Sequence, residues 1–99
     1  MFFSTIQIPH ISGFTNNEES SPLVVGDTIQ FRGSWYDAWN TGDEGTTTPD
    51  LNKDYYIVDV SRDTANERWL YRISNEEGGA HLNLSDGIFN HMEVEVWLT

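Results

Sequence analysis

The sequence contains no cysteine, a single lysine (Lys53) and no long hydrophobic run. Without cysteine, the chain has no disulfide framework, no thiol nucleophile and no thiolate metal site. Its apolar stretches fall well short of the ~20 residues that a membrane span needs, and its first residues lack the cationic and apolar regions of a secretion signal. We therefore expect a soluble protein that is not exported by the usual route.

Positive charge is scarce. Five Lys and Arg residues stand against sixteen Asp and Glu residues, which gives a formal net charge of -11. This sign disfavours direct binding to nucleic acids and to anionic membranes, because such binding depends on cationic contacts to phosphate. Three explanations of the acidity remain: a solubilising surface, adaptation to high salt, or imitation of a polyanion that occupies a basic cleft of another protein.

Helical periodicity is also absent, and the patterns that are present are those of strands. Ninety-nine residues, 13% of them aromatic, are enough for one compact core. Alternating runs rich in β-branched and aromatic residues predict strands over residues 24–32, 55–60, 68–73, 80–84 and 92–98. The sequence therefore predicts a single all-β domain.

The alternation also predicts which side chains share a face of their strand. These sets are Val25, Ile29 and Phe31, then Trp69, Tyr71 and Ile73, and then Ala80, Leu82 and Leu84. In the last strand, Met92, Val94, Val96 and Leu98 are expected to face inward. Asp27 shares the parity of the first set, but a bend or bulge at Gly26 would turn it outward. Arg68 and Arg72 share the opposite face of their strand, where they can pair with carboxylates on a neighbouring strand.

Four connections are predicted between these runs. Residues 34–52 form a long connection with no period of its own, and connections of this length inside compact domains are usually functional or mobile. Residues 62–67 and 75–79 are typical of turns. Ser85 and Asp86 can cap a single helical turn over Ile88–His91.

The first 22 residues form a leader with two interpretations. Phe2, Ile6 and Ile8 share a face if the chain is extended, and Pro9 then interrupts the pattern. The leader is either an extra strand or wrap over the barrel, or an arm that docks on a neighbouring subunit. In the second case six apolar side chains would be buried there: Phe2, Phe3, Ile6, Ile8, Ile11 and Phe14. An arm of this kind would be removable, with residues 23–99 remaining folded.

The order of the elements and three short motifs resemble the small SH3-like domains of bacterial and phage proteins. Gly26-Asp27 opens the first strand, Tyr55-Tyr56 lies in the strand after the long connection, and Ser85-Asp86 precedes the last strand. The resemblance covers residues 24–98 and implies a small five-stranded SH3-like antiparallel barrel over residues 23–99, with residues 1–22 as an N-terminal extension. It also implies binding of peptide or cell-wall material through aromatic residues of the long loop.

The cluster Trp35-Tyr36-Asp37-Ala38-Trp39 is the most unusual part of the sequence, because large aromatic side chains in a loop are costly to leave in water. Such residues are enriched at binding hot spots, and carboxylates nearby would attract a cationic peptide. The alternative is that these rings fold back as a lid on the barrel. The candidate partner-binding residues are Trp35, Tyr36, Trp39, Asp37, Asp43, Glu44, Phe2, Phe3, Ile6 and Ile8.

Metal and catalytic motifs do not emerge from the sequence. Asp43, Glu44 and Asp50 do not fit the alternating spacing of an EF-hand, and the three histidines contain no tight pair for zinc. Ser85-Asp86 near His81 or His91 has the residue types of a nucleophilic triad, but there is no nucleophile elbow and a turn cap explains Ser85 more simply. We expect no catalytic residue, no metal and no cofactor.

Two functions remain as hypotheses. The first is a non-enzymatic structural or interaction module, such as a capsid decoration or head-tail accessory protein of a phage virion, which docks on a larger assembly through its leader and loop aromatics. The alternative is an acidic nucleic-acid mimic that inhibits a DNA-binding or nuclease (anti-defence) protein. Both predict a protein partner, in a homo- or hetero-oligomer, and a location in the cytoplasm or the virion.

Overall fold

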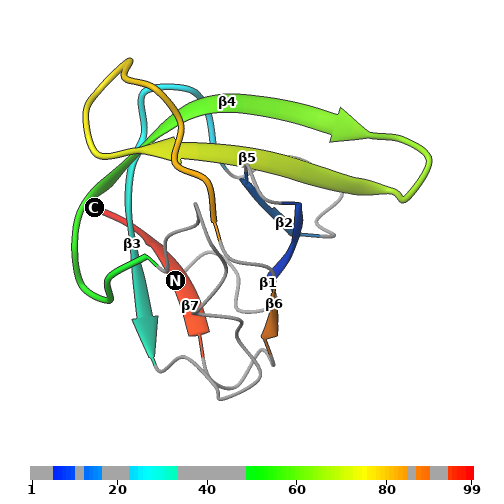
Figure 1. Ribbon diagram of the computed structural model, residues 1–99, viewed down its shortest axis with the longest axis horizontal. Helices are drawn as coiled ribbons and strands as arrows, with labels where there is room; N and C mark the ends of the chain where they lie inside the picture. Colours follow the sequence, from blue (N-terminus) through cyan, green and yellow to red (C-terminus); the bar gives the residue numbers. More distant parts are fainter. Residues whose placement is uncertain (1–5, 11–12, 17–22, 34–48, 85–86, 90–93) are drawn as a thin grey trace.

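The computed structural model describes residues 6–10, 13–16, 23–33, 49–84, 87–89 and 94–99, and in these ranges the fold is all-β. Its strands are β1 (Ile6–His10), β2 (Gly13–Asn16), β3 (Thr28–Gly33), β4 (Tyr55–Asp63), β5 (Arg68–Ser74), β6 (Gly87–Phe89) and β7 (Val94–Leu98). They form one antiparallel sheet in the order β6-β1-β2-β5-β4-β3-β7 (Figure 1). Within these ranges, no helix of a length and apolar character that could cross a membrane is present. The all-β prediction is confirmed, although over the described residues the sheet has seven strands rather than five and its end strands β6 and β7 do not pair.

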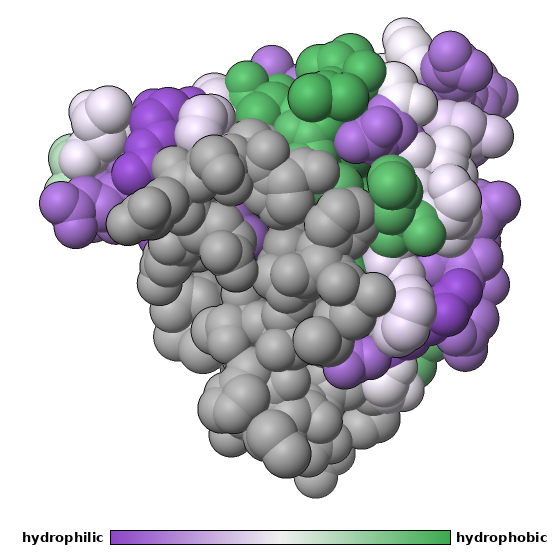
Figure 2. All heavy atoms as spheres, turned by 180° about the vertical axis from the view of Figure 1, so that it is seen from behind, coloured by the Kyte–Doolittle hydropathy of each residue, from purple (hydrophilic) through white to green (hydrophobic). Residues whose placement is uncertain are grey.

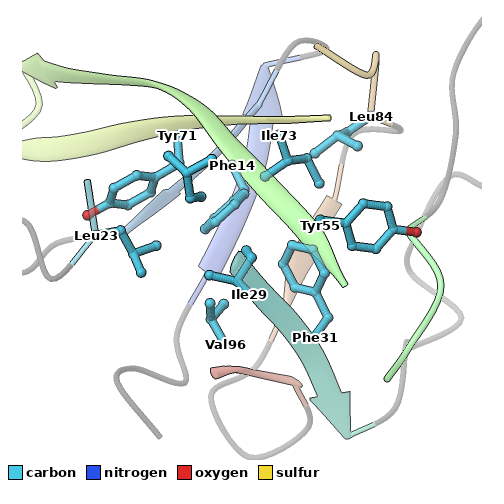
Figure 3. Close-up of a cluster of buried hydrophobic side chains, with 10 residues drawn as sticks. Phe14, Leu23, Ile29, Phe31, Tyr55, Tyr71, Ile73, Leu84 and Val96 are labelled. Atoms are coloured by element: carbon cyan, nitrogen blue, oxygen red, sulfur yellow. The ribbon is translucent and has the colours of Figure 1, made fainter. Parts of the chain in front are cut away.

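The sheet curls around its core. Phe14 on β2 and Phe31 on β3 are separated by β5 and β4 in the strand order. In a flat sheet, three strand spacings would hold them roughly 14 Å apart. Their ring centroids are nevertheless 5.3 Å apart, in an edge-to-face arrangement. The strands between them must therefore bend, which brings the inner-face side chains of β2, β3, β4, β5 and β7 together (Figure 3).

The core consists of ten buried apolar side chains: Phe14, Leu23, Ile29, Phe31, Tyr55, Ile57, Tyr71, Ile73, Leu84 and Val96. Six of these, Ile29, Phe31, Tyr71, Ile73, Leu84 and Val96, belong to the sets that alternation placed on a shared face, and Val96 was among those expected to face inward. Trp69 and Leu82 pack against the same cluster while partly exposed.

The prediction for the start of the first strand is wrong. Residues 24–27 form a β-turn, in which the Asp27 N–H donates to the Val24 carbonyl over 3.1 Å. Gly26 has φ 98°, the left-handed value that the third position of a type II turn requires. The Asp27 carboxylate turns back and accepts the Val24 N–H at 2.9 Å. Val25, expected to share a face with Ile29 and Phe31, is consequently 61% exposed while those two are buried, whereas the predicted outward turn of Asp27 at this bend is confirmed.

The β4–β5 hairpin is longer than predicted, because β4 continues to Asp63. A register shift between Ile57 and Asp59 marks a β-bulge. Arg72 lies 3.6 Å from the Asp59 carboxylate and Arg68 donates to Asp63 at 2.9 Å. The predicted pairing of these arginines with carboxylates on the neighbouring strand is confirmed.

The leader supplies two strands of the sheet. β1 pairs with β2 and β6, and β2 pairs with β5 through Phe14 opposite Tyr71. Pro9 does not end β1; it falls within the register shift between Gln7 and His10, where a residue without an N–H is tolerated. Phe14, considered above as a docking residue of an arm, is instead fully buried in the core of its own chain.

Two further predictions near the C-terminus are wrong. Residues 80–83 are not in a strand: β2 already occupies the edge of β5 over Trp69–Tyr71, and the segment makes one bond there, from Leu82 N–H to the Ile73 carbonyl at 2.8 Å. Ile88 and Phe89 belong to β6 rather than to a helical turn, because their backbone pairs with β1. The rest of that predicted turn, residues 90–91, lies outside the described ranges.

Candidate interaction surface

Most of the predicted partner-binding residues lie outside the described residues: Phe2, Phe3, Trp35, Tyr36, Asp37, Trp39, Asp43 and Glu44. Ile6 and Ile8 lie in β1, where they occupy register positions opposite Phe89 and Gly87 of β6. The surface described below therefore comes from other residues.

The end of the long connection is fixed beside β3. Asn52 N–H donates to the Phe31 carbonyl at 2.8 Å, and Leu51 forms a parallel bridge with the same residue. The Asp50 N–H donates to the Tyr55 hydroxyl at 2.7 Å. Burial of this phenol raises the pKa of Tyr55 above its ordinary value, although the bond from Asp50 opposes the shift. Residues 49–52 thus anchor the connection to the core.

Exposed apolar side chains are few in the described ranges. The large ones are Val24, Val25 and Leu98, which are 63%, 61% and 50% exposed. Val24 and Val25 occupy the turn before β3, and Leu98 occupies the end of β7, opposite Ile29 of β3. Figure 2 shows hydrophobic surface gathered in the upper part of one face, bordered by polar residues. Apolar surface of this kind on an otherwise polar protein is typical of contact sites.

Leu98 is exposed because it is the last residue of strand β7. Val96 and Leu98 share the inner face of β7, opposite Phe31 and Ile29. Val96 is fully buried, whereas Leu98 lies beyond the core and remains half exposed. The prediction that Leu98 faces inward is therefore correct for its side of the sheet but wrong for its burial.

The register also fixes the direction of the β7 backbone groups. The Thr99 N–H donates to the Thr28 carbonyl at 2.9 Å, so residues 95, 97 and 99 direct their backbone groups toward β3. In an antiparallel ladder the alternate residues direct theirs the opposite way. The N–H and C=O groups of Val94, Val96 and Leu98 therefore face away from β3, at the end of the strand order.

The outer face of β3 and β7 carries a connected row of polar and aromatic side chains. Gln30 donates to Asp54 at 2.7 Å and accepts from Arg32 at 3.0 Å. The Arg32 guanidinium lies over the Trp97 ring, 4.6 Å from its centroid, and the Trp97 indole N–H donates to Glu95 at 3.0 Å. This row holds the Glu95 carboxylate beside Trp97 on the outermost strand.

Each of the five cationic side chains has a partner within the described ranges. Lys53 lies near Asp50 and Asn75 and over the Tyr55 ring, and Arg62 lies over the Trp69 ring at 5.1 Å. The remaining arginines have the partners given above. Since no other lysine or arginine occurs in the sequence, the acidic side chains left over give the surface its excess negative charge.

The hairpin carboxylate Asp63 provides a test of pH dependence. Hydrogen bonds from the Asn66 side chain and then from Arg68 lower the pKa of Asp63. A depressed pKa in the folded state means that the stabilisation is present above the unfolded pKa and is lost as pH falls through the folded value. We expect the NMR titration midpoint of Asp63 to lie below the ordinary value of an aspartate and to rise in Asn66→Ala. An unchanged midpoint in that variant would contradict the assignment of the main cause.

The described ranges contain no group of three or more His, Asp or Glu residues that could hold a metal ion. The exposed apolar residues that sequence reasoning did not single out as candidate contact residues are Val24, Val25 and Leu98. The signal for the first two was available, because a Gly-Asp pair after two valines also fits a type II turn.

Comparisons of the chain with family models, with curated proteins and with solved structures found no match.

Proposed function

We propose that this protein is a non-enzymatic interaction module, a small SH3-like barrel of the phage type that docks on a larger protein assembly such as a capsid or a head-tail joint. The observation that carries the proposal is the exposure of three large apolar side chains, Val24, Val25 and Leu98, on a strongly acidic protein. Exposed apolar side chains of this kind favour association, because a partner protein that covers them removes them from water.

The strand arrangement supports the SH3-like part of the proposal. A small barrel needs its last strand beside its first, and β7 pairs with β3 over five residue pairs, Ile29 to Gly33. The order β7-β3-β4-β5 then continues through the strands expected for such a barrel. The phage resemblance of residues 24–98 supplies the class of assembly.

The test is capture of partners on the immobilised full chain, from the native lysate or particle, with elution in steps of salt. We expect a scaffold protein of the assembly to be retained through ~1 M salt, where electrostatic screening acts within about 3 Å. Val24→Asp combined with Val25→Asp should abolish retention. Thr64→Asp combined with Ala65→Asp adds the same charge at the exposed hairpin turn, and this control variant should retain the scaffold protein as the parent does. Release of the scaffold protein by modest salt would contradict the proposal.

A nucleic-acid mimic is the second candidate. It is supported by the engagement of all five cations, which leaves exposed acids such as Glu67, Glu76 and Glu77 to act on a basic groove. In the same capture experiment a mimic would release a nuclease or another DNA-binding protein at modest salt or on addition of DNA. The two functions therefore predict opposite elution behaviour.

A further inference from the structure

We infer that Val24, Val25 and Gly26 form a rigid apolar tip, which inserts into a close-fitting apolar pocket of the partner protein. The inference rests on the proposed function and specifies the shape and chemistry of the surface that the partner presents. Three features support it: the exposure of the tip, the hydrogen bonds that fix its backbone, and the charge of the protein that carries it.

The tip projects into solvent. Val24 and Val25 are 63% and 61% exposed, and Gly26 is exposed as well. A Cβ added at Gly26 would meet nothing within 4 Å, so the space beside it is open. Figure 1 shows the turn at the periphery of the molecule, in the cyan loop before β3. A short projecting segment with two apolar side chains buries most of its surface when the partner site is concave.

Four hydrogen bonds fix the backbone of the turn. Within it, the Asp27 N–H donates to the Val24 carbonyl over 3.1 Å, and the Val24 N–H donates to the Asp27 carboxylate over 2.9 Å. Two bonds of 2.9 Å join the turn to β4, from the Gly26 N–H to the Ile57 carbonyl and from the Ile57 N–H to the Asp27 carbonyl. Leu23, directly before the turn, is fully buried. The two valines are therefore held in one arrangement before any partner binds, which lowers the entropy cost of association.

The charge of the protein favours a protein pocket over the other apolar surfaces that could cover the tip. A membrane that contains anionic lipids repels a body of charge -11. A second copy of the chain carries the same charge, and two projecting tips would bury far less area against each other than the roughly 1,200 Å² of a stable interface. An apolar pocket on a protein of opposite charge has neither disadvantage.

The rigidity of the tip can be tested on the free full-length protein by NMR relaxation. The backbone order parameters of Val24, Val25 and Gly26 should be about 0.85, the value of rigid backbone. Asp27→Ala removes the carboxylate that holds the Val24 N–H, and the order parameters should fall toward about 0.6. Asp27→Asn keeps a side-chain oxygen that can accept the same bond and should remain near the parent. A flexible tip in the parent, or no difference between the two variants, would overturn the inference.

The pocket can be tested with the scaffold protein that the capture experiment retains. Val25→Trp enlarges an exposed side chain, so the variant should fold as the parent does. A close-fitting pocket cannot accommodate the larger ring, and the dissociation constant should rise at least about tenfold. On a flat apolar surface the same substitution would add buried apolar area and tighten binding. Ala65→Trp places the same ring at the exposed hairpin turn and should bind as the parent does. Unchanged or tighter binding by Val25→Trp would overturn the inference.

The outcomes distinguish this inference from the proposed function. Release of the scaffold protein at modest salt contradicts the proposed function, and that result does not depend on the fit at Val25. Retention at high salt together with tighter binding by Val25→Trp leaves the module function standing and refutes the pocket alone. If the parent binds phosphatidylcholine vesicles or dimerises in sedimentation, and Val24→Asp combined with Val25→Asp abolishes this, a lipid surface or a second copy covers the tip and the inferred partner is wrong.

Discussion

Replacing Phe14 with alanine is expected to lower the free energy of unfolding by about 3–5 kcal/mol, the usual cost of truncating a large buried ring. Phe14 is fully buried, and its ring centroid lies 5.3 Å from those of both Phe31 and Tyr71. The residue therefore links the leader to β3 and β5 at the centre of the core. Since domains of this size have a total stability of roughly 5–15 kcal/mol, the loss is a large share of it.

Urea denaturation followed by tryptophan fluorescence measures this loss. Val25→Ala is the control, because the Val25 side chain is 61% exposed. Its substitution should change the free energy of unfolding by no more than about 0.5 kcal/mol. Removal of residues 1–22 should unfold the chain, since it deletes Phe14 together with the β2 partner of β5. A truncated protein that unfolds cooperatively at nearly the parent's urea concentration would restore the interpretation of the leader as a separable arm.

Alternation predicted the parts of this fold in which one face of a strand is buried. Ile29 and Phe31, Tyr71 and Ile73, and Val96 all came from a period of two, and each is in the core. The pairing of Arg68 and Arg72 with carboxylates followed from the same parity. These features follow from the alternation of side chains along one strand, so they can be predicted from the sequence alone.

The sequence could not specify features that depend on distant partners. Residues 10–22 have the composition of a loop, yet Thr15 and Asn16 are 2% and 3% exposed because β2 is inserted between β1 and β5. That insertion occupies the edge of β5 over Trp69–Tyr71, so a strand over residues 80–84 cannot pair there. The exposure of Leu98 likewise follows from where the strand ends, which alternation within β7 does not reveal. The candidate surface was missed for this reason, since it consists of a turn and the end of a strand.

Gly13 offers the second large effect, because its Cα lies against the backbone of β5 at Tyr71. A Cβ added at Gly13 would collide with the Tyr71 carbonyl oxygen and lie 3.1 Å from Leu70 Cδ1. A leucine side chain can shift, but a backbone carbonyl within the sheet cannot move without displacing β5. Gly13→Ala should therefore push β2 outward, weaken its three pairs with β5 and withdraw Phe14. We expect a loss of about 3 kcal/mol, the upper part of the range for overpacking.

Gly26→Ala is the matched comparison, since it makes the same chemical change by a different mechanism. A Cβ there would meet nothing within 4 Å, but φ is 98°, so only the strain of a left-handed residue is added, about 1 kcal/mol. Urea denaturation gives the two losses, and hydrogen exchange of the Leu70 and Tyr71 amides should accelerate beyond the global change only in Gly13→Ala. If both variants lose the same stability with no local change at β5, the close packing of β2 on β5 is not what requires glycine at position 13. If Gly13→Ala is the costlier and the local acceleration is seen, the leader is bound to the rest of the sheet by direct contact between backbones, which no other residue type at this position would allow.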